Sequence, residues 1–474
     1  MDRREFISLT ATAVATVIVR PALAQSPAIE LTLPSIPGPT MPAEFTGLSY
    51  EMAQIYNPNF FSPSNTPLIT AFRNLSPHGV LRLGGHLSNI TPWEGVGQQD
   101  AKQLEGVRHG IEDYWEWPLV DPSIQKNKHG IISRAAIRNL RAFLDATNWR
   151  LIYTLNFASG SPARAVDEAA FVSRTLGPRL IAFVLGNEVD GYGDDPVFRA
   201  KGYDFDQYFA EYQHWTKTIR AAVPHAPFAG PETEHGIDTW LQPFARRTHG
   251  EAALLTTHYY GMGPASDPTM TAHRLLQKHN PELDKLIAGA HAATHASGGT
   301  PYRLDEAISC YGGGRPGVSD TFASALWVAD FMLAIASAGI VGVNLHGGGT
   351  GFYTPIETSA QSPAAPRPSY FGMQFAQRFS GFAIAPCPLA TQANLTAYLG
   401  THGPRTQLAL INKGPEPVTL TLPNNLAKKL THTLTLKAST LDAKTGTTLS
   451  TESAANPDPT KTIPAYTALL FLES

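Results

Sequence analysis

The sequence has little of three things that would place it at once in a familiar class: cysteine, charge and long apolar runs. Only Cys310 and Cys387 occur in 474 residues, which excludes a disulfide-stapled scaffold, although a bridge between the two stays open. No group of Cys and His has metal-ligand spacing. Charged residues make up 16% of the chain, the formal net charge is −3, and basic residues cluster no further than pairs. We therefore expect no metal, no organic cofactor and no nucleic-acid partner.

One apolar run lies at the N-terminus and has the layout of a signal peptide. The basic pair Arg3-Arg4 precedes a mostly apolar stretch, Phe6–Val19, and the small residues Ala22-Leu23-Ala24 follow it. The pair resembles a twin-arginine export signal. The apolar stretch is short for the roughly 20 residues that span a bilayer, but an uncleaved anchor stays open. We expect residues 1–24 to be removed and the mature protein to be a monomer in the bacterial periplasm or outside the cell, without membrane contact.

Between about residues 45 and 382, short apolar runs rich in β-branched residues alternate with longer amphipathic stretches. This alternation predicts repeated β-α units and a parallel sheet. The predicted strands are Phe45–Tyr50, Val80–Leu83, Arg150–Leu155, Leu180–Leu185, Pro227–Gly230, Ala253–His258, Pro301–Leu304 and Ile340–Leu345. The helical candidates include Ser133–Thr147, Ala165–Thr175, Phe205–Ala222 and Asp320–Ala338.

Polar residues collect at the carboxyl ends of the predicted strands. Counting strands alone leaves a doubly wound open sheet as an alternative, but polar residues at every strand end favour a closed barrel, whose strand ends meet at one mouth. We therefore predict an α/β fold with a (β/α)8 TIM barrel over residues 45–382. The residues at the predicted strand ends include Glu51, Arg82, His86, Asn156, Asn187, Glu188, Glu232, His258, Tyr260, Asp305, Glu306 and His346.

Beyond residue 383 the pattern changes to short alternating segments separated by Gly, Pro, Asn and Asp. Such a pattern is typical of a β-sandwich. Another alternating strand, Ala28–Leu33, precedes the barrel and can complete the same sandwich. We predict an accessory β-sandwich domain made of residues 28–40 together with 383–474.

Two glutamates stand where the chemistry of glycoside hydrolysis needs them. Cleavage requires a proton donor for the departing oxygen and a second carboxylate on the other side of the sugar. Glu188 ends the fourth predicted strand and Glu306 follows the seventh, so the two face each other across the barrel mouth. We assign Glu188 as acid/base and Glu306 as nucleophile. Glu188 must then stay protonated near neutral pH, and a nearby ionised Glu306 would raise its pKa.

Neighbouring polar residues can support this pair. The Asn187 amide can bind the sugar 2-hydroxyl, a contact that strengthens in the transition state. The Tyr260 phenol can donate to the Glu306 carboxylate, and Arg82 can approach it from below and lower its pKa. His258, two residues before Tyr260, is a further supporting residue.

The segment after Glu306 resembles the nucleophile region of the heparanase-like glycoside hydrolases of family 79. The resemblance rests on Cys310-Tyr311-Gly312-Gly313-Gly314 and Ser319-Asp320-Thr321-Phe322, and a second match is Val184-Leu185-Gly186-Asn187-Glu188. Shorter matches occur in the same order along most of the barrel: Arg82 to Gly85, Leu155-Asn156 and His258 to Tyr260.

The resemblance implies a barrel flanked by a β-sandwich and retaining cleavage of β-linked glucuronic acid. It implies that Tyr311, the backbone around Cys310 and Tyr353 hold the sugar carboxylate, and that Glu51 binds sugar hydroxyls. His86 departs from the family pattern, because animal heparanases have a small polar residue there. The large processed insert and the basic clusters of animal heparanase are missing. We therefore expect an exo-acting β-glucuronidase that releases terminal glucuronic acid from a glucuronide or a glucuronic-acid-containing saccharide.

Other readings stay open. An endo-acting β-glucuronidase on glycosaminoglycan chains is the first alternative, and a xylosidase or arabinofuranosidase of the same clan is another. A carbohydrate-binding barrel without activity is a third, although both glutamates are present. An esterase, suggested by His346-Gly347-Gly348-Gly349, is disfavoured because the chain has no Gly-x-Ser-x-Gly elbow.

Overall fold

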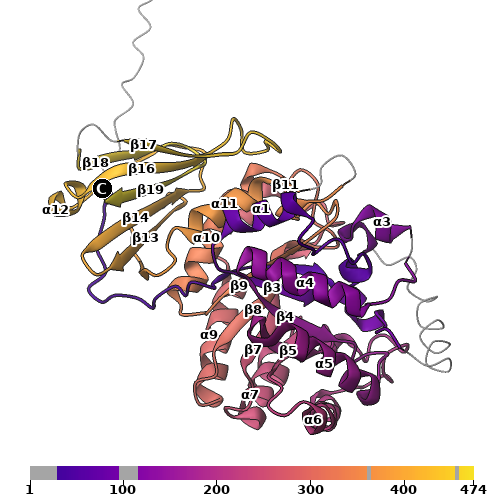
Figure 1. Ribbon diagram of the computed structural model, residues 1–474. Coiled ribbons are helices and arrows are strands. Elements are labelled where there is room, and N and C mark those ends of the chain that lie inside the picture. The colour runs from indigo at the N-terminus through magenta and orange to yellow at the C-terminus, as the bar shows by residue number, and fades with distance from the viewer. Residues whose placement is uncertain (1–28, 96–115, 127, 360–363, 454–457, 474) are drawn as a thin grey trace, which may run out of the picture.

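A computed structural model describes residues 29–95, 116–126, 128–359, 364–453 and 458–473 (Figure 1). The predicted signal peptide lies outside these ranges and stays a prediction. Within them, no helix combines the length and the apolarity needed to cross a bilayer.

Eight parallel strands close into a barrel in chain order, which confirms the predicted (β/α)8 fold and excludes the open sheet. The strands are β2 (Thr46–Glu51), β3 (Val80–Gly84), β4 (Arg150–Leu155), β5 (Leu180–Leu185), β6 (Phe228–Thr233), β7 (Leu254–Pro264), β8 (Tyr302–Tyr311) and β9 (Val343–Gly347). A helix follows each strand and covers the outside of the barrel (Figure 1). These helices are α1 (Thr66–Leu75), α4 (Arg134–Thr147), α5 (Pro162–Leu176), α6 (Phe205–Ala222), α7 (Gln242–Thr248), α9 (Pro281–Ala296), α10 (Phe322–Ser337) and α11 (Pro368–Gln377).

The barrel strands are apolar on both faces because both faces are buried. In β5, Phe183 and Leu185 belong to the large core that the helices share, whereas Ala182 and Val184 belong to a separate small cluster with residues of other barrel strands. The residues of the small cluster fill one layer inside the barrel, and polar groups occupy the carboxyl ends of the strands above it. The members of the small cluster are Val80, Ile152, Ala182, Val184, Ala229 and Leu254.

Strands β7 and β8 run past the predicted ends, so Tyr260 and Glu306 lie within strands rather than after them. The prediction stopped early because polar residues interrupt both apolar runs. The register between the two strands shifts at this point: Thr257 pairs with Leu304, and His258 pairs with Glu306. The residue skipped by this shift, Asp305, is the extra residue of a β-bulge. Bulges re-aim side chains, and they are common beside active sites.

Apart from a two-stranded sheet of β10 (Ile356–Glu357) and β11 (Ala365–Pro366), the other described strands form two sheets that share a second apolar core. The larger sheet has the order β12 (Ala383–Pro386), β13 (Leu395–His402), β14 (Arg405–Asn412), β19 (Thr467–Glu473), β16 (Leu430–Lys437) and β17 (Thr448–Ser453). The smaller sheet has the order β1 (Ile29–Glu30), β15 (Val418–Thr421) and β18 (Thr460–Ile463). The core between them includes Leu408 and Leu410 of the large sheet and Leu420 and Ile463 of the small one.

A polar cluster fixes this sandwich to the barrel. Asp330 of α10 accepts hydrogen bonds from Thr396 Oγ1 and the Tyr398 hydroxyl, both at 2.7 Å, and pairs with Lys413 Nζ at 2.5 Å. Tyr398 and Lys413 are largely buried. The carboxylate is therefore neutralised inside the interface, where an unpaired charge would be costly.

Candidate active site

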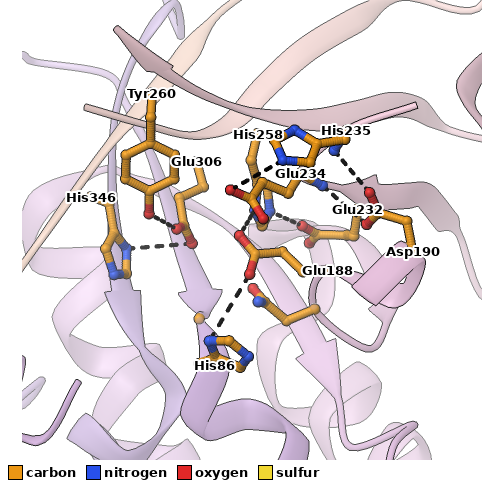
Figure 2. A network of polar contacts seen from close by, with 12 residues as sticks. His86, Glu188, Asp190, Glu232, Glu234, His235, His258, Tyr260, Glu306 and His346 are labelled. Carbon is orange, nitrogen blue, oxygen red and sulfur yellow. Dashed lines mark hydrogen bonds and ion pairs between the residues drawn. The ribbon is translucent and has the colours of Figure 1, made fainter. Parts of the chain in front are cut away.

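The carboxyl ends of the barrel strands surround a cavity of about 270 Å³. Its size suits a single sugar ring, and every lining residue carries a polar or ionisable group. Figure 2 shows the polar contacts of several of these residues. The lining residues are Glu51, His86, Glu116, Asn187, Glu188, Glu234, His235, Tyr260, Glu306, Tyr311 and His346.

Glu188 and Glu306 both line this cavity, and a carboxylate oxygen of one lies within 4.8 Å of a carboxylate oxygen of the other. Retaining glycosidases hold their two carboxyl groups about 5–5.5 Å apart, whereas inverting enzymes leave roughly 6.5–9.5 Å for a water molecule. The separation therefore fits direct attack on the sugar by one carboxylate. Glu188 reaches this position from a left-handed backbone conformation, with φ of 51°.

The Glu306 carboxylate is braced on both oxygens. The Tyr260 hydroxyl donates to Oε1 at 2.6 Å, and Arg82 Nη1 donates to Oε2 at 2.5 Å. Burial raises the pKa of Glu306, but the charges of His346, His258 and Arg82 and the Tyr260 hydrogen bond outweigh it and hold the pKa well below the usual range. Glu306 is therefore ionised, as its predicted role of nucleophile requires.

The sequence predicted that Glu188 stays protonated near neutral pH, but its surroundings favour the ionised carboxylate. Burial raises the pKa of Glu188, but the hydrogen bond from His258 Nδ1 at 3.0 Å and the charges of His258 and His86 bring it below its usual value. The charge of Glu306 does raise this pKa, as predicted, but it is the weaker influence. His86 and His258 were predicted to lie near the site, but their effect on the pKa of Glu188, which they flank on both sides (Figure 2), was not.

His258 holds the proton that Glu188 lacks. Burial lowers the pKa of His258, but the charges and hydrogen bonds of Glu306, Glu188 and Glu232 raise it well above its usual value. Its Nε2 lies 2.7 Å from Glu232 Oε2, and its Nδ1 faces Glu188. One proton thus resides on the Glu188–His258 pair in the free protein, close enough to pass between them.

Arg82 lies beneath the cavity and links the two sides of the site. It is fully buried, and its Nη2 donates to Asn187 Oδ1 at 2.7 Å and to Glu232 Oε2 at 3.0 Å, while Nη1 reaches Glu306. With its oxygen occupied by Arg82, Asn187 has its buried Nδ2 group without a hydrogen-bond partner among the described residues. This free donor lines the cavity and can bind a sugar hydroxyl.

A second pair of acids lies below the site at two strand irregularities. Glu232 interrupts the pairing of β6 with β7 and has φ of 62°, and Asp305 is the bulge residue of β8. Neither Asp305 oxygen has a donor among the described residues, but the carboxyl group faces Glu232. Burial and the charge of Glu232 raise the pKa of Asp305 well above its usual value. Asp305 is therefore neutral and can donate its proton to Glu232.

These side chains also form the groups closest to a metal site in the described part of the chain. Glu188, His258 and Glu306 approach within 4.8 Å of one another, and so do Glu232, His258 and Asp305. Arg82 already pairs with a carboxylate in each group. A cation there would compete with a buried guanidinium, so the groups are better suited to holding protons.

The other predicted residues divide into two sets. Glu51 lines the cavity and accepts from Leu87 N at 2.9 Å, and Gly85 leaves room for it, since a Cβ there would lie 2.3 Å from the carboxylate. Tyr311 stands at the rim, 37% exposed. Cys310 and Tyr353 are buried and do not line the cavity. The Tyr353 ring centroid lies 5.9 Å from that of His346, and the Tyr353 hydroxyl has no partner among the described residues.

Four residues that affect the charge of the site were not predicted. Glu116, Glu234 and His235 line the cavity, and Asp190 lies beside it. Glu116 pairs with His86 at 3.0 Å, and the Asp190 carboxylate accepts from the backbone N–H groups of Glu234 and His235. No strand pattern marks Glu116, since it lies within the long connection between β3 and β4. His346 was noted only at a strand end, yet its Nδ1 lies 3.5 Å from Glu306 Oε2.

His258→Gln is expected to move the alkaline limb of the pH profile of kcat/KM to lower pH. In the native protein the pair keeps its proton up to the raised pKa of His258; in the variant the proton is held by Glu188 alone, whose pKa as a carboxyl group lies lower. The measurement is kcat/KM of a glycoside against pH. Asp305→Asn is the matched control, because it replaces a neutral acid by a neutral amide and should leave the limb in place. An unchanged limb in His258→Gln would contradict the shared proton.

The barrel, the sandwich and the two facing carboxylates define the fold and site architecture of the (β/α)8 glycoside hydrolases. No family model matches the chain. The chain is similar to a β-glucuronidase of Aspergillus niger, with 27% identity over 47% of this chain and 46% of the relative, and to one of Neurospora crassa, with 30% identity over 56% and 55%. The resemblance predicted from the motifs is confirmed at this level. The chain matches only about half the length of these curated relatives.

Solved structures of this architecture cover nearly the whole chain. A 4-O-α-L-rhamnosyl-β-D-glucuronidase of Fusarium oxysporum has a TM-score of 0.71 at 16% identity and covers 94% of this chain and 99% of its own. The family 51 α-L-arabinofuranosidase AbfB of Bifidobacterium longum has a TM-score of 0.67 at 14% identity, with 95% and 100% covered. At these identities the likeness shows the fold alone.

Proposed function

We propose that this protein is a retaining glycoside hydrolase that removes terminal β-linked glucuronic acid. The observation that carries the proposal is the approach of Glu188 and Glu306 to within 4.8 Å across a cavity of sugar size, with Glu306 ionised. The similarity to fungal β-glucuronidases supports the choice of sugar.

The geometry supports a double displacement. A carboxylate oxygen of Glu306 attacks C1 of the sugar as the bond from C1 to the leaving oxygen breaks, and Glu188 gives that oxygen the proton that it shares with His258. The product of this step is a glycosyl ester on Glu306. Glu188 then takes a proton from a water molecule whose oxygen attacks C1, and Glu306 leaves as a carboxylate. The proton returns to the Glu188–His258 pair, so the cycle closes.

The sugar can bind to hydrogen-bond donors that have no partner within the described part of the protein. The Asn187 Nδ2 group is buried and unpartnered among the described residues, and the Tyr311 phenol stands at the rim. The Tyr353 hydroxyl also has no partner among the described residues, but Tyr353 does not line the cavity. Neutral donors can bind a carboxylate by charge-assisted hydrogen bonds.

The proposal predicts a ranking of nitrophenyl glycosides. We expect p-nitrophenyl β-D-glucuronide to be cleaved with kcat/KM at least about a hundredfold above the β-D-glucoside, the β-D-xyloside and the α-L-arabinofuranoside, because a site built for a carboxylate leaves donors unpaired with the others. Release of nitrophenol is the readout. A preference for the arabinofuranoside or xyloside would move the protein to another activity of the same fold, and no release from any substrate would favour a binding protein.

A further inference from the structure

A larger cavity opens beside the sugar-sized one. Its volume is about 770 Å³, and both cavities are lined by Glu234, His235, Tyr260 and Tyr311. His258 also lines the larger cavity, while its partner Glu188 lines the smaller one. The proton donor therefore stands at the junction. Since a glycosidase protonates the leaving oxygen, the larger cavity lies on the side of the leaving group.

The floor of the larger cavity is apolar. Ile237 comes from the turn of π-helix at Ile237–Leu241, Leu286 and Gly289 come from α9, and Met262 comes from β7. Gly289 lets α9 approach this turn, because a Cβ there would lie 2.1 Å from Ile237 Cγ2. Apolar side chains closed against each other in this way offer contact area to an apolar ring and few hydrogen bonds.

The rim of the same cavity is acidic. Glu234, Asp238 and Glu282 line it, and the single Lys or Arg among its lining residues, Lys285, has its Nζ 2.9 Å from Glu282 Oε1. An anionic group placed here would meet these carboxylates. The cationic groups of the lining are already paired, Lys285 with Glu282, and the buried His258 with Glu188 and Glu232. Repulsion between like charges lowers the affinity for such a ligand by several-fold or more.

We propose that this larger cavity is the binding site for the leaving group of the substrate, and that it selects an uncharged leaving group with an apolar ring face. The inference rests on the proposed function and deepens it. It places the sulfated, polyanionic chains that an endo-acting enzyme would cut among the poor substrates of this protein.

A matched pair of substrates tests the charge selection. We expect kcat/KM for 2-naphthyl β-D-glucuronide to exceed that for its 6-sulfonate by at least about tenfold. The sulfonate makes the naphthol a slightly better leaving group, so chemistry alone would give the opposite order. In the double variant Asp238→Lys with Glu282→Lys, the ratio should fall by about fivefold or more. Equal rates on the two substrates in the native protein would overturn the proposal.

A second test fills the cavity. Ala288 of α9 is exposed and lines the larger cavity, whereas Ala292, one turn further along the helix and also exposed, lines neither cavity. Ala288→Trp should lower kcat/KM for the naphthyl glucuronide by about tenfold through KM, and Ala292→Trp should not. Glucuronyl fluoride has no bulky leaving group, and its hydrolysis should be the same in both variants.

Hydrolysis of glucuronyl fluoride distinguishes a wrong function from a wrong assignment of the larger cavity. If the native protein does not hydrolyse glucuronyl fluoride, the proposed function fails. If it does, but Ala288→Trp leaves the naphthyl glucuronide unaffected, the assignment of the larger cavity is wrong while the function stands.

Discussion

Glu306→Gln is expected to lower kcat on p-nitrophenyl β-D-glucuronide by at least about ten-thousand-fold, because an amide cannot form the glycosyl ester. Substrate binding should change little. Glutamine keeps nearly the same shape and still offers an oxygen to Arg82 or Tyr260, which now contact the carboxylate. Single-turnover kinetics and calorimetric titration with the glucuronide measure the two quantities separately.

Glu44→Gln is the matched control for this loss. Glu44 is a partly exposed glutamate before β2, at the opposite end of the barrel, where its Oε2 pairs with Arg150 at 3.1 Å. Full activity of Glu44→Gln with a collapse of Glu306→Gln is the expected pattern. Substantial turnover by a correctly folded Glu306→Gln protein would exclude Glu306 as the nucleophile.

Glu188→Ala is expected to show a loss that depends on the leaving group. A poor leaving group such as an alkyl alcohol needs protonation, so kcat/KM should fall by about a hundredfold to ten-thousand-fold. Fluoride needs no such acid, and the first step on glucuronyl fluoride should be nearly unaffected. Rates of both substrates, native against variant, give the measurement.

Added azide provides the second readout for this variant. With the Glu188 side chain gone, a small anion can enter and attack the glycosyl ester without general-base help. We expect azide to restore turnover and to yield β-glucuronyl azide. An equal loss on both substrates, or an α-azide product, would contradict the role of Glu188 as acid/base.

The fold could be predicted from the sequence because buried parallel strands consist of short runs of apolar residues. The runs at Val80, Arg150 and Leu180 begin where β3, β4 and β5 begin, and helix Phe205–Ala222 was predicted to the residue. The helix boundary is sharp because Asp204 and Gln207 form a capping box. Strands β7 and β8 were predicted too short, since His258, Asp305 and Glu306 look like strand ends but are buried within strands.

The site could be predicted only as far as strand ends determine it. Glu188, Glu306 and Asn187 follow from their positions after apolar runs, and the structure brings them to one cavity. The contacts of Arg82 and Tyr260 with Glu306 were predicted, because all three residues lie at strand ends that meet at the barrel mouth. The protonation of Glu188 could not be predicted, because it depends on the contact of His258 with Glu188, 70 residues away. Local sequence holds no signal for that contact.

The most direct test of the central claim is to trap the intermediate and locate it. The protein is incubated with 2-deoxy-2-fluoro-glucuronyl fluoride, which slows both steps but keeps a good leaving group, and the digested product is sequenced by mass spectrometry. The account predicts one added fluoroglucuronyl group per chain, carried on Glu306. A label on another side chain, or turnover of the reagent without any covalent adduct on a carboxylate, would contradict it.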